Sequence, residues 1–158
     1  MNTNEIKLAR PEDIPQIVAF GYKSFKENSL EDFGASPDFD KTTLFITELV
    51  MSGAVLTLRS TLHDAILDGV FVIKYDKAWW SIDPVLRSIL LYIKEDKRTY
   101  QNAVKLLKAG QEYAIMEGMP LVVDLISKVD TQRKKKLIER QGFEELGSFL
   151  VFNPKQKE

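Results

Sequence analysis

An apolar segment over residues 88–94 is followed by a charged turn at 95–98, a long helical segment at 99–117 and a second apolar segment at 121–126. The helical segment contains no proline, and its small and apolar residues recur at the spacing of one helix face. Short apolar runs on either side of such a helix are typical of strands. The sequence therefore predicts a strand–helix–strand unit, in which the helix crosses from one strand to the next.

The turn of this unit predicts an anion site. Arg98 stands directly before the helix, and residues 99–103 (Thr-Tyr-Gln-Asn-Ala) form its first turn. The first N–H groups of a helix have no acceptor within the helix, and the helix dipole is positive at that end. Phosphate groups bind readily at such a position. If the chain takes a phosphorylated cofactor, we expect it at this turn.

The rest of the chain predicts one α/β domain over residues 1–158. The expected elements are a strand at 5–10, a helix from 11 to about 25, a loop at 27–40, a helix at 41–52, strands at 54–59 and 65–75, the unit at 88–126, a helix at 131–141 and a strand at 148–152. Residues 77–84, with Trp79 and Trp80, either continue a strand or form a loop. This order predicts a central mixed, twisted sheet with helices on both faces.

Composition and charge exclude several classes of protein. Of the 158 residues, 44% are hydrophobic and 28% are charged, as in ordinary folded domains. The formal net charge of -1 provides no field that would attract nucleic acid or an anionic membrane. No apolar run approaches the roughly 18 residues of a membrane span, and the start of the chain lacks a signal pattern. We therefore expect a cytoplasmic protein with neither a nucleic-acid nor a membrane partner.

Metal and thiol chemistry are also excluded by residue counts. The chain has no cysteine, so it can form no disulfide, thiolate zinc site or nucleophilic thiol. Its single histidine, His63, rules out a multi-histidine metal site. Because His63 falls in a polar turn, we expect a solvated loop residue there rather than a catalytic base.

Two segments resemble signatures of the GNAT superfamily of N-acetyltransferases, enzymes that use acetyl-coenzyme A. The family's cofactor signature is Arg or Gln, two residues, Gly, one residue, and then Gly or Ala. Here it would read Arg98-Thr-Tyr-Gln-Asn-Ala103. The family's short helix that ends in Gly-Phe is similar to residues 137–143 (Leu-Ile-Glu-Arg-Gln-Gly-Phe). The order of elements, beginning with residues 6–14, is similar along nearly the whole chain.

The resemblance implies the GNAT-type fold of acyl-CoA N-acyltransferases. It also implies acetyl transfer from acetyl-coenzyme A to a primary amine of a small molecule or peptide, by direct attack. The main chain of the strand at 91–93 would pair with the pantetheine arm, and Arg98 and the amides after it would hold the pyrophosphate. The implied cofactor-binding residues are Leu91, Tyr92, Ile93, Arg98, Thr99, Tyr100, Gln101, Asn102, Ala103 and Thr131.

Three positions depart from the family pattern. Gln101 stands where glycine is general, and a side chain there obstructs close approach of the backbone to phosphate. Ile138 stands where many members have the tyrosine that protonates the leaving thiolate. Thr131 stands where asparagine is common. These departures leave the expected fold intact and weaken the expectation of catalysis.

Acetyl transfer to an amine needs a base for the ammonium proton and an acid for the leaving thiolate. The candidate bases are Asp83, before the central strand, and Asp124, on the next strand; either could act through water. The candidate acids are Tyr92 and Tyr100, and Ser127 is a further hydroxyl. Each has a plainer explanation: a turn or surface residue for most of them, and a core residue for Tyr92.

Other functions remain open from the sequence. The three departures favour a catalytically degenerate GNAT-fold protein, acting as a binding or structural component of a larger assembly such as a virus particle. The basic run at 133–136 could bind the adenosine 3′-phosphate or, more weakly, nucleic acid, although a solvated helix face explains it too. Trp79 and Trp80 could line a substrate pocket or pack under a loop. A homodimer, supported by the strand at 148–152, is a further possibility.

Overall fold

The computed structural model describes residues 4–28, 30, 34, 36–127, 129–147 and 150. These residues form both strands and α-helices, with 3-10 turns at Pro11–Asp13 and Glu95–Lys97. In chain order the elements are β1 (Asn4–Leu8), α1 (Ile14–Glu27), α2 (Phe39–Met51), β2 (Val55–Ser60), β3 (Leu67–Lys77), β4 (Pro84–Ile93), α3 (Tyr100–Glu117), β5 (Leu121–Val122) and α4 (Thr131–Arg140). No helix in these ranges is long and apolar enough to cross a bilayer.

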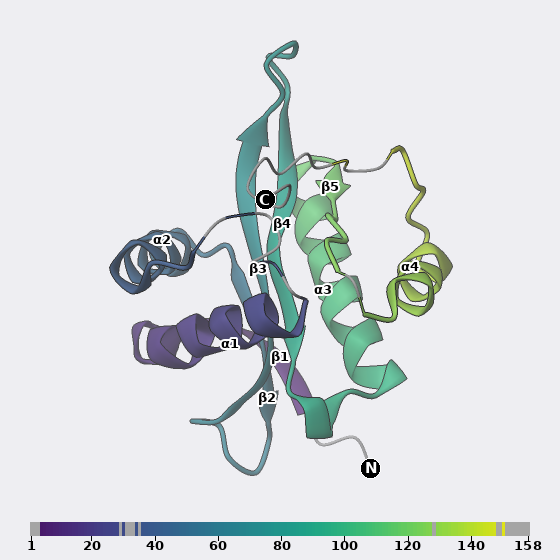
Figure 1. Cartoon of the computed structure of the whole chain (residues 1–158). Helices are drawn as coiled ribbons and strands as arrows, with labels where there is room; N and C mark the ends of the chain where they lie inside the picture. Colours follow the sequence, from purple (N-terminus) through teal and green to yellow (C-terminus); the bar gives the residue numbers. More distant parts are fainter. Residues whose placement is uncertain are drawn as a thin grey trace, which may run out of the picture.

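The strands form one mixed sheet in the order β1-β2-β3-β4-β5. The first three pairings are antiparallel, and β4 pairs with β5 in parallel, across α3. Helices α1 and α2 lie on one face of the sheet, and α3 and α4 lie on the other side (Figure 1). The predicted α/β architecture, with a strand–helix–strand unit at β4–α3–β5, is confirmed.

Two apolar layers hold the helices to the sheet. Side chains along β3 alternate between the two faces, as in any strand. Val70 and Val72 pack toward α1 and α2, beside Ile17 of α1. Phe71 packs on the opposite face, beside Leu106 of α3. The central strands are therefore covered on both faces, which explains their nearly continuous apolar sequence.

A buried ion pair fixes the beginning of α1 to the sheet. Arg59 of β2 and Asp13, in the turn before α1, expose 0% and 2% of their side chains and bond to each other. Arg59 also donates to Thr57 Oγ1 at 3.0 Å and to the carbonyl of Asp64 at 2.8 Å. Neither charge is left without partners, which is the condition for burying an ion pair.

Helix α3 has well-defined ends. The Thr99 hydroxyl accepts from the amide of Asn102, so Thr99 is the N-cap. Gly118 adopts φ 66°, a left-handed conformation that favours glycine, and closes the C-terminus. A Cβ on Gly110 would lie 2.3 Å from the Phe71 ring, so a residue without a side chain lets α3 approach the sheet closely.

Three predicted boundaries were wrong or fall outside the structure. Strand β4 starts at Pro84 rather than 88, because it pairs with β3 across the whole hairpin up to Lys77. Strand β5 ends at Val122 rather than 126, because its chain leaves β4 there. The expected strand at 148–152 lies, apart from residue 150, outside the described residues.

Candidate functional site

A β-bulge in β4 separates this strand from β5. Val72 pairs with Leu90 and Ile73 with Ser88, so Ile89 is an extra residue without a partner on β3. Bulges bend a strand and increase its twist. Beyond the last pair with β5, at Arg87 and Val122, the amide of Asp124 bonds to the Ser88 hydroxyl at 3.1 Å instead of a strand carbonyl. The two strands diverge from this point, which we call the fork.

The bulge also decides which main-chain groups of β4 face the fork. The amide of Lys94 donates to Asp68 of the β3 side, so Lys94 faces β3. Because successive residues of a strand alternate their N–H and C=O groups between its two edges, Leu91 and Ile93 face away from β3. Their main-chain groups point to the side where β5 has left the sheet. The sequence predicted that residues 91–93 pair with pantetheine; the main chain of Tyr92 instead faces β3, where it pairs with Val70.

The start of α3 offers fewer amides than the sequence predicted. The amide of Thr99 bonds to Lys97 O at 2.9 Å, that of Asn102 to Thr99 Oγ1 at 3.1 Å, and that of Ala103 to Thr99 O at 3.1 Å. Within the described residues, the amides of Tyr100 and Gln101 have no recorded acceptor. The anion site thus comprises two amides and the positive end of an 18-residue helix. The Gln101 side chain is exposed and makes no recorded bond that closes the site.

The Asn102 side chain stabilises the turn before α3 from within rather than facing a ligand. Its side chain is buried and donates to the carbonyl of Lys97 at 2.9 Å. It also accepts a long bond, 3.5 Å, from the side chain of Asn4. These bonds hold the turn before α3 against the start of β1, so Asn102 contributes by shaping the loop.

Arg98 turns back from the loop toward β4. Its Nε donates to the carbonyl of Ile93 at 2.8 Å, and its guanidinium pairs with Glu27 of α1 at 2.6 Å. The guanidinium carbon also lies 5.3 Å from the centre of the Tyr92 ring. Arg98 therefore bonds to a carbonyl on the open edge of β4, beside the anion site.

Tyr92 lies beneath this arginine on the α1 side of the sheet. Its ring packs against Phe20 at a centroid distance of 5.1 Å, and its hydroxyl donates to Glu27 at 3.3 Å. Burial, and next the nearby charge of Glu27, raise the pKa of Tyr92 above its ordinary value. The phenol is held protonated, but it points at a carboxylate rather than at the fork.

The chain after β5 supplies the other side of the fork. Ser127 Oγ donates to Asn28 Oδ1, at the end of α1, at 2.7 Å. Lys134 of α4 reaches the same place, with Nζ 2.9 Å from Ser127 Oγ and 3.4 Å from Asn28 Oδ1. Burial lowers the pKa of Lys134, and the positive charge of Arg98 lowers it further. The fork cluster, as we call it, consists of Glu27, Asn28, Tyr92, Arg98, Ser127 and Lys134.

Asp124 lies where the fork begins. Its carboxylate is 3.3 Å from Arg87 Nε, and 18% of its side chain is exposed. Arg87 also pairs with Asp76 of β3 at 3.0 Å. The Arg87 guanidinium thus bridges Asp124 and Asp76 where β4 and β5 part. The structure thus places Asp124 near the open edge of β4.

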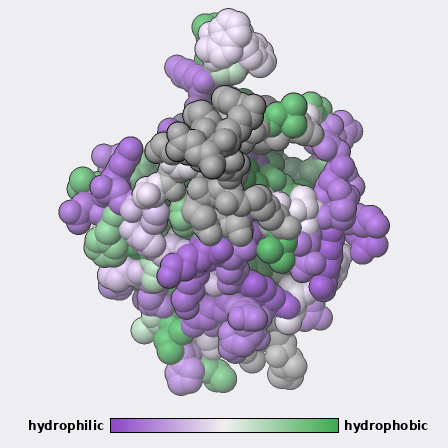
Figure 2. Space-filling model, in the orientation of Figure 1, coloured by the Kyte–Doolittle hydropathy of each residue, from purple (hydrophilic) through white to green (hydrophobic). Residues whose placement is uncertain are grey.

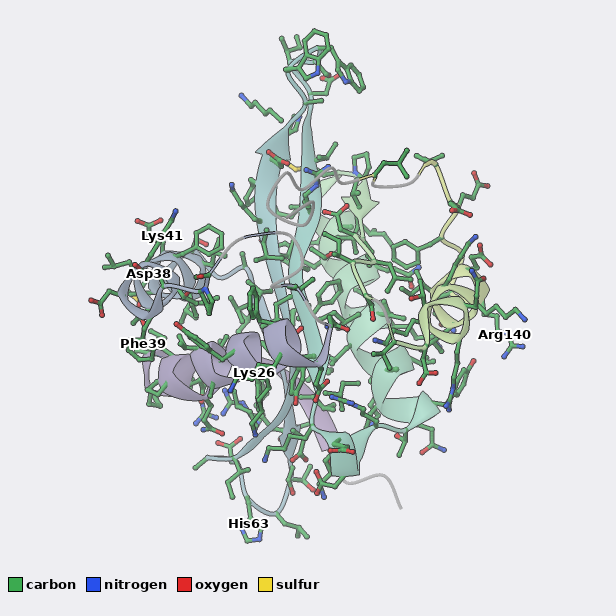
Figure 3. All side chains as sticks on the ribbon, viewed as in Figure 1. Lys26, Asp38, Phe39, Lys41, His63 and Arg140 are labelled. Carbon is green, nitrogen blue, oxygen red and sulfur yellow. The ribbon has the colours of Figure 1, made fainter. Side chains whose placement is uncertain are left out.

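Of the remaining candidates, Asp83 and the Tyr100 side chain are not brought to the fork, whereas Thr131 contacts Ser127. Asp83 precedes the first residue of β4, six residues from the bulge, which is roughly 20 Å along a strand. Tyr100 is exposed at the first position of α3. Thr131, at the start of α4, donates its hydroxyl to Ser127 O at 2.7 Å. His63 is exposed at the end of the β2–β3 connection (Figure 3), as expected.

Sequence reasoning missed three members of the fork cluster: Glu27, Asn28 and Lys134. The first two stand at the end of α1, where the sequence predicted only the start of a loop. Lys134 was counted within a solvated basic run. A signal was present, since Lys134 and residues 137 and 138 share one helix face and its neighbours in the run do not. In the described ranges, no acidic or histidine cluster could hold a metal ion.

Comparison with known proteins gives the fold. Neither a family model nor a curated protein matches the chain. Among solved structures, a possible acetyltransferase from Clostridium difficile 630 matches with a TM-score of 0.71 and 17% identity, covering 96% of this chain and 97% of that one. A predicted acetyltransferase from Clostridium acetobutylicum, solved with acetyl-CoA, matches with a TM-score of 0.71 and 13% identity, over 97% of both chains.

A third structure, ribosomal-protein-alanine N-acetyltransferase from Brucella melitensis biovar Abortus 2308, matches with a TM-score of 0.65 and 16% identity. It covers 95% of this chain and 98% of that chain. The chain therefore has the GNAT-type acetyltransferase fold along nearly its whole length. At these identities the likeness establishes the fold, and the activity has to be argued from the site.

Proposed function

We propose that this protein is an acetyl-CoA-dependent N-acetyltransferase acting on a primary amine. The observation that carries the proposal is the open edge of β4 next to the start of α3. Leu91 and Ile93 there offer main-chain donors and acceptors to an extended chain, and the amides of Tyr100 and Gln101 offer donors to phosphate. Acetyl-CoA presents these two chemistries in the same order: an amide-containing arm and a pyrophosphate.

Binding requires one internal contact to open. Arg98 Nε donates to the Ile93 carbonyl that pantetheine would use, and Glu27 pairs with the guanidinium. We propose that Arg98 exchanges these partners for pyrophosphate oxygens, which accept charge-assisted bonds. Because the Arg98–Glu27 pair is about 40% exposed on both sides, its loss costs little.

The reacting groups follow from the same geometry. The amide of Leu91 can donate to the acetyl oxygen as negative charge develops on it. Asp124, through water, can take the proton of the attacking ammonium. Lys134 can protonate the leaving thiolate, a role that Ile138 cannot fill because its side chain has no proton to give. The lowered pKa of Lys134 makes its side-chain ammonium a stronger acid than that of an ordinary lysine.

A second function is favoured by the same internal bonds. If Arg98 stays with Glu27 and Ile93, the fork is closed to a ligand and the chain is a degenerate GNAT-fold protein. It would then act as a binding or structural component of a larger assembly. The two proposals differ in whether acetyl-CoA binds at all.

Calorimetry with acetyl-CoA at up to millimolar concentration separates them. We expect binding by the native chain and none by Arg98→Glu, because the substitution places a negative charge beside the pyrophosphate. Lys41→Glu, the same charge change on the exposed side of α2 (Figure 3), should bind normally. Circular dichroism checks that both variants are folded. No heat from the native chain would remove the enzyme proposal and leave the structural one.

A further inference from the structure

The β3–β4 hairpin extends beyond the rest of the sheet. Strand β2 begins at Val55, opposite Val72, and the last bond between the two sides joins Ile73 N to Ala54 O. On the other edge, pairing with β5 begins only at Leu86. Residues 74–85 therefore form a two-stranded ribbon, which we call the arm; its tip stands clear of the body in Figures 1 and 2. Isolated two-stranded hairpins are marginally stable in water.

The end of the arm is apolar. Trp79, Trp80 and Ile82 expose 96%, 74% and 89% of their surface. Single exposed apolar residues are ordinary, but three large ones at the end of a projecting hairpin mark a contact surface. The polar residues of the arm include two lysines and two aspartates, so it has no basic cluster for an anionic membrane. A protein surface is the better match.

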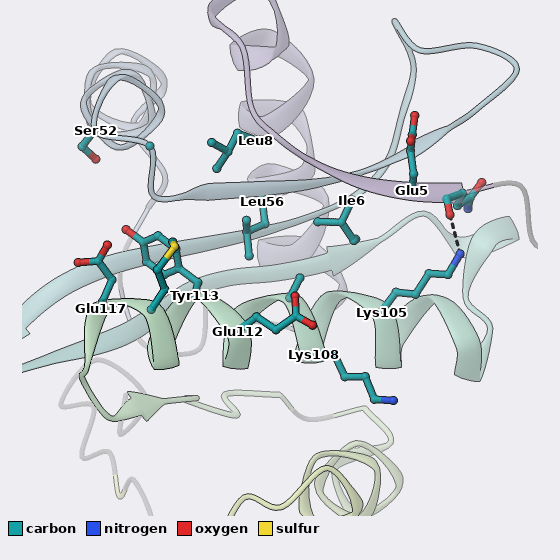
Figure 4. A pocket seen from close by; sticks show the side chains of 14 residues that line it. Glu5, Ile6, Leu8, Ser52, Leu56, Lys105, Lys108, Glu112, Tyr113 and Glu117 are labelled. Carbon is teal, nitrogen blue, oxygen red and sulfur yellow. Dashed lines mark hydrogen bonds between the residues drawn. The ribbon is translucent and has the colours of Figure 1, made fainter.

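A complementary surface lies at the base of the same arm. Helix α3 and the β1–β2 edge enclose an open groove of about 770 Å³ (Figure 4). Its apolar lining includes Ile6, Leu8, Leu56 and Met116, and Leu8 and Met116 expose 55% and 74% of their surface. Glu117, at one end of the groove, accepts a bond of 2.5 Å from the hydroxyl of Tyr75 in the arm.

We propose that two copies of this chain form a dimer by exchanging arms, with the end of each arm in the α3–β1 groove of the other copy. Two arms that lie side by side and antiparallel place the tip of each at the base of its partner. That base is where the groove lies. The contact is therefore isologous and closes after two copies, as most homodimers do.

The sizes of the two surfaces agree with this arrangement. Each tip carries two tryptophans, which can bury roughly 150–250 Å² each, and an isoleucine. Counting both partners and both exchanges gives an interface of about 1,600 Å² or more, the size of stable protein–protein contacts. The formal net charge of -1 per chain adds almost no repulsion between copies.

The two tryptophans of the chain are both in the arm, so their fluorescence reports on it directly. We expect sedimentation equilibrium at micromolar concentration to give twice the chain mass of 18.1 kDa. Tryptophan emission should move to longer wavelength on dilution, as the rings pass from the groove into water. A monomer at 100 µM, or emission typical of water at every concentration, would overturn the proposal.

Two variants and a control locate the contact. Trp79→Ser with Trp80→Ser removes the tip, and Met116→Glu places a charge in the groove; each should shift the dimer to monomer by at least about tenfold in dissociation constant. Leu62→Ser, which removes an apolar residue 75% exposed outside the arm and groove, should have no effect. A mixture of tip and groove variants should regain one of the two exchanges. A dimer that survives Met116→Glu with buried tryptophans would show that the tip binds elsewhere.

Discussion

Arg98 and Lys134 are both cations of the fork cluster, but they lie in different surroundings. Arg98 is more than a third exposed and has a carboxylate partner. Lys134 has hydroxyl and amide partners and is bonded to no carboxylate among the described residues. Desolvation therefore weakens the charged form of Lys134, while the Arg98 guanidinium is paired with the Glu27 carboxylate. These different environments suit the roles that we propose for the two cations: phosphate binding for Arg98 and proton donation for Lys134.

Replacing Lys134 should change the pH profile of acetyl transfer. An acid must be protonated, so the rate should fall as pH rises through the pKa of Lys134. Because burial and Arg98 lower that pKa, the fall should begin below the range of an ordinary lysine. We expect Lys134→Met to lose about 100-fold in kcat and to lack this alkaline limb.

Lys134→Arg serves as the matched control. It keeps a donor toward Ser127 but holds its proton more firmly, so the alkaline limb should move to higher pH while the fold is unchanged. Glu27, Arg98 and Asp130 are the charged groups around Lys134. An unchanged alkaline limb in Lys134→Met would show that Lys134 is not the acid.

Helix α3 shows how closely elements pack in this fold. Its face toward the sheet has Gly110 directly over Phe71, whose side chain is fully buried. In most helices alanine is favoured over glycine by about 1 kcal/mol. At Gly110 the new methyl group would overlap the ring, and overpacking costs about 1–3 kcal/mol. The tight contact between α3 and β3 thus depends on one missing side chain.

We expect Gly110→Ala to lower the free energy of unfolding by up to about 2 kcal/mol, since the clash outweighs the helix propensity. Gly21→Ala in α1 meets no atom within 4 Å and should raise stability by about 0.5–1 kcal/mol. Urea denaturation of the two variants gives the comparison. Equal effects would mean that Phe71 moves without cost.

Local patterns predicted the elements well and their ends less well. Gly118 and Pro120 marked the end of α3 correctly, because a left-handed cap and a missing N–H are local properties. The early end of β5 depends on Ser88, thirty-six residues away from the Asp124 amide that it binds. Such a side-chain acceptor far along the chain leaves no trace in a local pattern.

The candidate site was predictable only where it is formed by residues close together in sequence. Arg98 and the start of α3 belong to one continuous segment, so the sequence located them. The three amides that are used internally have local acceptors, Lys97 and Thr99, whereas the Arg98–Glu27 pair joins residues 71 positions apart. Asp83 was considered because it precedes β4, but the hairpin extends β4 and takes it away from the fork.

At the scale of the whole molecule, the Arg59–Asp13 pair joins segments that are distant in sequence. It connects the start of α1 to β2 and, through the Asp64 carbonyl, to the β2–β3 connection. Both side chains are almost completely buried. Removing one partner of such a pair leaves a charge without compensation, which is far costlier than the pair itself.

We expect Asp13→Asn to lower the free energy of unfolding by about 3–5 kcal/mol, a large part of the total for a domain of this size. Replacing both residues, by Asp13→Leu with Arg59→Met, should cost less. Glu5→Gln, which breaks an exposed pair with Lys7, should cost less than about 1 kcal/mol. Guanidinium denaturation measures all three. A loss below 1 kcal/mol for Asp13→Asn would contradict this role of the pair.

The extra residue at Ile89 has a consequence for how this chain can vary. Before this residue, the even-numbered Leu86 points its amide toward β5. After it, the odd-numbered Leu91 and Ile93 point their amides to that side. Deleting that one residue would restore regular alternation, because Leu90 would follow Ser88 directly and Leu91 and Ile93 would still face away from β3. The deletion would instead remove the local bend that helps β4 part from β5. The extra residue therefore matters for the opening of the fork, whereas the length of the hairpin beyond it sets how far the arm reaches.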